Sequence, residues 1–239
     1  MRHSPARAHY QQQMAAAQPA EGSAQPLDKA SANAYELMLV KLAEDKRRLK
    51  DIKSVEKKAD LKAQLLPDYQ PWIDGVLEAD TGRQDDVLMT VFVWAIDTGS
   101  LKLALAIGDY ALKHNLVMPD QYQRDVASVL AEEIAALALK ADDDYRLANL
   151  SHLWTTIGLT DHHDIHDAIR AKLYKAHGYA LRAAGEPVLA RQHLARALEL
   201  DARAGVKKDI ERLDVVIKNL PAETGDAQAK AEGATDSTG

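Results

Sequence analysis

The sequence contains no cysteine. This absence excludes disulfide bonds, thiolate nucleophiles and cysteine-ligated zinc sites, and it suits a reducing cytoplasm. Aromatic residues are also scarce, at 5% of 239 residues with a single Phe, so Leu, Ala, Val and Ile have to form most of the core. Because Ala and Leu lose little rotamer freedom in a helix, this composition favours an all-α fold.

No run of apolar residues approaches the roughly 20 that a membrane-spanning helix needs. Arg2 and Arg7 are not followed by an apolar segment, so the N-terminus does not read as a secretory signal. We therefore expect no membrane partner. Thirty basic residues against 36 acidic ones give a net charge of −6, which excludes general nucleic-acid binding and leaves DNA binding to a local basic patch.

The common catalytic signatures are missing as well. The chain has no GxxxxGK[ST] phosphate loop, so no ATPase is recognisable. It also lacks GxSxG, HExxH and GxGxxG. These absences leave open whether the chain is an enzyme, and the motifs point to no resident cofactor.

Composition changes along the chain divide it into four parts. Both ends are rich in Ala, Gln, Ser, Gly or Pro and lack apolar periodicity, which is typical of disorder. Between them, apolar residues recur at spacings of three and four, which predicts helices. We expect Pro67 and Pro71 to end the first predicted helix. The predicted parts are a disordered arm (1–32), a long basic helix (33–66), a domain of packed helical hairpins (67–220) and a disordered tail (221–239).

One pattern repeats 86 residues further on in the chain. Gly99 and Ala104 recur as Gly185 and Ala190, and Ala111 and Leu112 recur in the same way as Ala197 and Leu198. Each Gly lies between two predicted helices, and the small Ala residues allow the second helix to approach the first. The pattern predicts helical hairpins with a tetratricopeptide-like character.

The long basic helix has three interpretations. It is net positive within a net negative protein, so it can lie along DNA phosphates. Alternatively, it is a solvated face with i,i+4 pairs such as Glu44–Arg48, or a coiled-coil helix that drives oligomerisation.

Two clusters offer metal-ligating side chains. His162 and His166 are four residues apart, so on a helix they would share a face and offer imidazole ligands. Asp85 and Asp86 are paired carboxylates, the type of residue that a two-metal nuclease gathers. Both clusters are also typical of helix starts, where acidic and capping residues are common.

Several strings identify a family resemblance. They resemble the small terminase subunits of temperate tailed phages, a family also labelled terminase endonuclease subunit, over most of residues 35–213. The strings are YELMLVKLAEDKRRLK (35–50), LLPDYQPWIDGVLE (65–78), QDDVLMTVFVWAIDTG (84–99), YALK (110–113), and the stretch at 169–213 that includes AGVKKDIERL.

The resemblance implies a function. Small terminase subunits recognise the packaging site on viral double-stranded DNA in the host cell cytoplasm, form oligomers and deliver that DNA to the large ATPase subunit. On this reading we expect phosphate contacts from Lys46, Arg47, Arg48, Lys50, Lys53, Lys57 and Lys58, with Lys207 and Lys208 as secondary candidates.

Two alternatives remain. In the first alternative, the chain is itself a metal-dependent endonuclease. Mg²⁺ would then be its cofactor, and Asp85 and Asp86 would be the catalytic candidates. In the second alternative, the chain is a tetratricopeptide-like scaffold that binds only protein.

Overall fold

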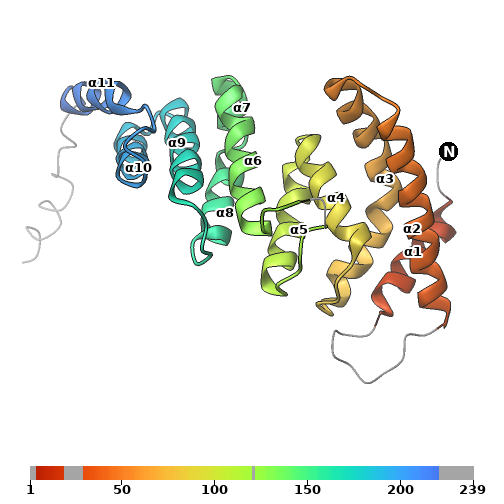
Figure 1. The fold of residues 1–239 in the computed structure, drawn as a ribbon. Helices are drawn as coiled ribbons and strands as arrows, with labels where there is room; N and C mark the ends of the chain where they lie inside the picture. Colours follow the sequence, from red (N-terminus) through yellow and green to blue (C-terminus); the bar gives the residue numbers. More distant parts are fainter. Residues whose placement is uncertain (1–3, 19–28, 120–121, 221–239) are drawn as a thin grey trace, which may run out of the picture.

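The computed structural model describes residues 4–18, 29–119 and 122–220, and this part of the chain is helical without a strand (Figure 1). The predicted all-α fold is confirmed. None of the helices described is long and apolar enough to cross a membrane. In chain order they are α1 (Pro5–Ala16), α2 (Lys29–Lys50), α3 (Val55–Ala79), α4 (Asp86–Asp97), α5 (Leu101–Lys113), α6 (Val126–Lys140), α7 (Asp143–Ala148), α8 (Leu150–Thr160), α9 (Asp167–Ala183), α10 (Pro187–Leu200) and α11 (Lys207–Lys218).

The helices form an extended row, with α1, α2 and α3 at one end and α11 at the other (Figure 1). One hydrophobic core runs from α1 to α9, and a smaller cluster around Leu194, Val206 and Leu213 joins α9, α10 and α11. Helix α4 lies at the centre of the larger core, because every residue from 87 to 96 is buried. Helix α4 therefore fixes the position of the helices that pack on it.

The predicted long helix over 33–66 is wrong as a single element. The chain folds back at residues 51–54, so that α2 and α3 form an antiparallel hairpin (Figure 1). The cause is local: Ser54 adopts an extended conformation and its side chain accepts a hydrogen bond from the Lys57 N–H, which caps a new helix. The basic segment therefore surrounds the tip of a hairpin.

Pro67 and Pro71 do not end a helix, as the sequence suggested, but lie inside α3. Each lacks the N–H that would bond the carbonyl four residues earlier. Helix α3 tolerates them because its packing outweighs two lost hydrogen bonds: Tyr69, Trp72 and Ile73 on the same helix are fully buried. The expected boundary between residues 66 and 67 consequently falls within α3.

The expectation of a disordered arm over 1–32 is also wrong for residues 5–16 and 29–32, which lie in α1 and α2. Helix α1 packs closely on α3, with Ala15 buried against the backbone of Gly75. Small residues on both helices make this close approach possible. A search for apolar periodicity misses helix α1, because these small residues form no apolar stripe. The predicted disordered tail at 221–239 lies outside the described residues.

Gly75→Ala tests this packing. A Cβ at Gly75 would lie 2.2 Å from the backbone oxygen of Gln12, so α1 would have to move. We expect a net loss of about 1–3 kcal/mol of unfolding free energy despite the better helix propensity of Ala. The matched control is Gly158→Ala in α8, where nothing lies within 4 Å of the new Cβ and stability should rise by up to about 1 kcal/mol. Urea unfolding measures both, and a stabilised Gly75→Ala protein would contradict the close packing.

The repeated glycine pattern marks two equivalent hairpins. Gly99 joins α4 to α5 and Gly185 joins α9 to α10, with φ angles of 70° and 78°. In both turns the residue after the glycine donates a hydrogen bond back to the last turn of the preceding helix, from Ser100 to Ala95 and from Glu186 to Leu181. The repeated Ala positions are fully buried, as the pattern predicts. The further likeness to tetratricopeptide units stays a prediction.

Candidate functional site

A buried carboxylate holds the base of the α2–α3 hairpin together. Asp45, 3% exposed, accepts hydrogen bonds from the Lys41 Nζ at 2.7 Å, the Arg48 guanidinium at 2.8 Å and the Tyr69 hydroxyl at 2.8 Å. Lys41 also pairs with Asp68 on α3 at 3.2 Å. Burial by itself would raise the pKa of Asp45, but the hydrogen bonds from Lys41, Tyr69 and Arg48 lower it overall. The network fixes α2 against α3.

This network makes a prediction about acid stability. Because the pKa of Asp45 is lowered from 3.8 on folding, its stabilisation is present above that pH and is lost as the pH falls through the folded-state pKa. We expect Asp45→Asn to cost about 2 kcal/mol at pH 7 and the gap to wild type to shrink below pH 4. Urea unfolding at pH 7, 5 and 3 measures it, and a gap that grew towards pH 3 would contradict the assignment.

Trp72, on α3, contacts both α2 and the start of α4. Its indole stacks on Tyr35 of α2 with 5.8 Å between ring centroids, and its Nε1–H donates to Asp85 at 2.9 Å. The other carboxylate oxygen of Asp85 accepts from the Leu88 N–H at 2.9 Å and caps α4. Burial raises the pKa of Asp85. Asp85 therefore joins α3 to α4, and its two oxygens are both used.

The tip of the hairpin carries the predicted cations. Residues 46–58 hold seven basic and two acidic side chains, an excess of five positive charges in a chain of net charge −6. Arg47, Lys50, Lys53 and Lys57 are exposed, and none of them has an ion pair within the described structure. Lys46 and Lys58 are half-buried, and Arg48 is tied to Asp45. Figure 1 shows this tip projecting beyond α4 and α5.

The N-terminus of α3 adds to the positive potential at the tip. The capped N-terminus of α3 begins at Ser54, and its free N–H groups and dipole favour an anion there. The last turn of α2 ends with basic residues, which offset the negative end of its dipole. The tip is therefore suited to a phosphate backbone.

Lys207 and Lys208 do not join this surface. Both are exposed at the start of α11, at the opposite end of the row from the hairpin tip (Figure 1). Any phosphate contact that they make belongs to a separate part of the protein.

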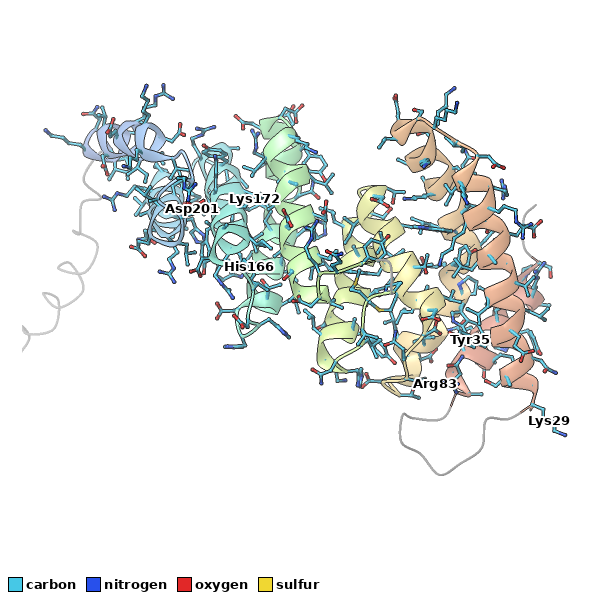
Figure 2. All side chains as sticks on the ribbon, in the orientation of Figure 1. Lys29, Tyr35, Arg83, His166, Lys172 and Asp201 are labelled. Atoms are coloured by element: carbon cyan, nitrogen blue, oxygen red, sulfur yellow. The ribbon has the colours of Figure 1, made fainter. Side chains whose placement is uncertain are left out.

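The acidic and histidine candidates do not converge either. Asp85 is buried, whereas the neighbouring Asp86 is exposed and its N–H donates to the Tyr35 hydroxyl at 3.1 Å. His162 and His166 lie in the loop before α9, so the expected shared helix face does not form. Figure 2 labels His166 at this loop. Within residues 4–18, 29–119 and 122–220, no group of three or more His, Asp or Glu side chains is placed to hold a metal ion.

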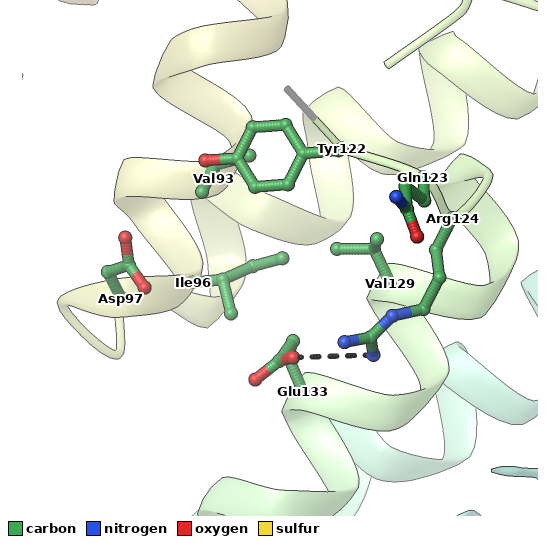
Figure 3. Close-up of a pocket in the computed structure, with 8 residues that line it drawn as sticks. All are labelled: Val93, Ile96, Asp97, Tyr122, Gln123, Arg124, Val129 and Glu133. Atoms are coloured by element: carbon green, nitrogen blue, oxygen red, sulfur yellow. Dashed lines mark ion pairs between the residues drawn. The ribbon is translucent and has the colours of Figure 1, made fainter. Parts of the chain in front are cut away.

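A cavity of about 400 Å³ between α4 and α6 contains carboxylates that are already neutralised (Figure 3). Asp97 forms an ion pair with Lys62, and Glu133 lies 3.8 Å from the Arg124 guanidinium. These pairs leave no cluster of unpaired acids in the cavity. The arrangement does not resemble a metal-dependent nuclease centre.

Composition alone does not separate the free cations from the structural ones. Lys41 and Lys62 belong to the same basic segment as the tip residues, yet they are used in ion pairs with Asp45, Asp68 and Asp97. The only local sign that a lysine of this segment forms an ion pair is the i,i+4 spacing of Lys41 and Asp45. The expected Glu44–Arg48 pair is replaced by Arg48–Asp45, because Asp45 lies on the buried side of α2.

Comparison with known proteins identifies relatives. A family model described as phage small terminase subunit matches residues 39–168. The chain is 45% identical over 218 residues to the terminase, endonuclease subunit, of Escherichia phage P2, covering 91% of this chain and 87% of that protein. It is 26% identical over 208 residues to a probable terminase, endonuclease subunit, of Haemophilus phage HP1 (strain HP1c1), covering 81% and 74%. No solved structure matches the chain.

Proposed function

Because this chain belongs to the phage small terminase subunit family, which acts in phage DNA packaging, we propose that it holds viral double-stranded DNA through the tip of its α2–α3 hairpin. The observation that carries the proposal is a set of four exposed basic side chains that form no ion pair with any described residue: Arg47, Lys50, Lys53 and Lys57. Side chains that no carboxylate neutralises can exchange solvent ions for phosphates, and the ions released favour binding.

The support at the base of the hairpin matters for this role. The Asp45 network fixes α3 to α2, and the ion pair between Lys62 and Asp97 fixes α3 to α4. A rigid hairpin presents its cations in one arrangement, so less conformational entropy is lost when they contact DNA. The described residues reveal no element that reads base edges, so the tip supplies affinity and position.

We propose that this chain positions DNA and that the large subunit cuts it. The two relatives are named endonuclease subunits, which favours the alternative that this chain cleaves DNA itself with Mg²⁺. The geometry offers that alternative little support, because the Asp85 oxygens are committed to Trp72 and Leu88 and Asp86 lies outside that buried site. In our proposal the chain carries no cofactor of its own.

Two further partners complete the proposal. We propose that the chain self-associates through the outer face of α2, where Leu37 and Val40 are 69% and 66% exposed. Exposed apolar residues on α10 and α11 (Val188, Leu189, Val215 and Val216) favour a contact between that end and the large terminase subunit. The assembly would act in the host cell cytoplasm. Light scattering tests self-association, and a monomer throughout the micromolar range would contradict it.

The decisive experiment uses labelled DNA containing the packaging site and a scrambled control. Binding is measured across a salt series with Mg²⁺ and with EDTA, and the same samples are then run on a denaturing gel. We expect salt-dependent binding, preference for the packaging site and intact DNA. Specific Mg²⁺-dependent cleavage would establish the endonuclease alternative, and no binding at low salt would leave a protein scaffold.

A further inference from the structure

A second cavity lies beside the basic tip. It has a volume of about 390 Å³, is open to solvent on one side, and is lined by α2, the start of α4 and the segment 117–119. Its walls are apolar on the sides formed by Leu39, Leu42 and Met118, and polar where Lys46, Asp86 and Thr90 line it. The volume falls within the roughly 300–1,000 Å³ typical of small-molecule sites. A group with one flat apolar body and polar edges would suit these walls.

Two polar side chains in this cavity lack a close hydrogen-bond or ion-pair partner among the described residues. Thr90 is 3% exposed and its hydroxyl forms no hydrogen bond in the described structure, which is costly for a buried polar group. Lys46 has no ion pair within 4 Å there; burial lowers the pKa of its ammonium group, and the charge of Asp86 across the cavity opposes that shift in part. A ligand that brought an anion to Lys46 and a hydrogen-bonding edge to Thr90 would satisfy both groups.

The cavity is continuous with the cations of the tip. Lys46, Lys50 and Lys53 follow one another at spacings of four and three, and Lys46 and Lys50 lie one turn apart on the same face of α2. A strand whose backbone follows this line of cations would reach the mouth of the cavity at Lys46. The occupant therefore has to be something that a DNA strand can offer at that point.

We propose that the cavity takes one unpaired nucleotide of the bound DNA, with its phosphate at Lys46 and its base inside. The base would pack between Leu39, Leu42 and Met118, as bases do in apolar pockets that accept extruded nucleotides. Asp86 accepts hydrogen bonds only, so it can take an N–H of any base: the amino group of adenine, cytosine or guanine, or the ring N–H of thymine. This inference rests on the proposed DNA-holding function and adds a site for a single nucleotide.

The test compares two duplexes of one sequence, one fully paired and one with a single unpaired 2-aminopurine. We expect wild type to bind the second about tenfold more tightly and to change its fluorescence. Ala43→Phe, at an exposed position on the cavity wall, should remove both effects and leave affinity for the paired duplex within about twofold. Thr90→Val, which deletes only the unpartnered hydroxyl, should weaken the preference. Ala63→Phe, exposed on α3 away from this cavity, is the matched control.

The outcomes separate the two proposals. If Ala43→Phe keeps the full preference and the fluorescence change, the cavity does not hold the nucleotide, although the tip still holds DNA. Equal wild-type affinity for both duplexes, with no fluorescence change, would also overturn the inference alone. If wild type binds neither duplex at low salt, the DNA-holding function and the inference both fail.

Discussion

Replacing Arg47, Lys50, Lys53 and Lys57 together with Ala is expected to weaken DNA binding by roughly 10³-fold at 0.15 M salt, since each phosphate contact contributes about 0.9 to the slope of log affinity against log salt. The slope should therefore become shallower by about 3.6. Because these side chains are exposed and have no ion pairs in the described structure, the unfolding free energy should change by less than about 1 kcal/mol. Fluorescence anisotropy across a salt series measures the effect.

A control with the same change in charge is available elsewhere on the surface. Lys102, Lys140, Arg203 and Lys218 are exposed on or beside other helices and have no side-chain ion pair in the described part of the chain. Their replacement with Ala removes four positive charges, but it should change the salt slope by less than about 1. If both quadruple variants lose affinity equally, net charge governs binding and the hairpin tip has no special role.

Asp85→Ala is expected to cost about 2–4 kcal/mol of unfolding free energy, because it removes the cap of α4 and leaves the indole N–H of Trp72 buried without a partner. Asp86→Ala should cost less than about 1 kcal/mol, since Asp86 is exposed and contributes only a favourable charge at the helix start. Urea unfolding at pH 7 compares them. Equal stability of the two variants would contradict the role of Asp85 as the joint between α3 and α4.

The variants Asp85→Ala and Asp86→Ala also test whether this chain cleaves DNA. A loss of cleavage in Asp85→Ala alone has a structural explanation, whereas a loss in the stable Asp86→Ala variant would point to a catalytic carboxylate. Asp86 is therefore the informative position when DNA cutting is assayed in the presence of the large subunit.

Local sequence signals were sufficient for the fold class and for the cations of the tip. Ala- and Leu-rich periodicity predicted the helices, and a net positive segment in an acidic chain predicted the basic surface. The predicted glycine turns at Gly99 and Gly185 form because only the left-handed conformation closes both hairpins. Each of these features depends on residues close together in the chain.

The errors arose where distant residues decide the outcome. Apolar spacing continues across Ser54, so a hairpin and a single helix look alike until the buried contacts between α2 and α3 are known. Pro67 and Pro71 carry a local cost that only the burial of their neighbours offsets. The cavity at Thr90 is built from three separate segments, and its only sequence signal is a hydroxyl within an apolar run.

The central claim is that DNA lies at the tip of the α2–α3 hairpin, and the absence of cysteine makes it directly testable. Lys53→Cys and Lys102→Cys each introduce a single thiol at an exposed position, which carries a short photo-crosslinker. We expect crosslinks to packaging-site DNA from position 53 at the tip, and background levels from position 102 on α5. Crosslinks from position 102 with none from position 53 would place the DNA elsewhere and contradict the account.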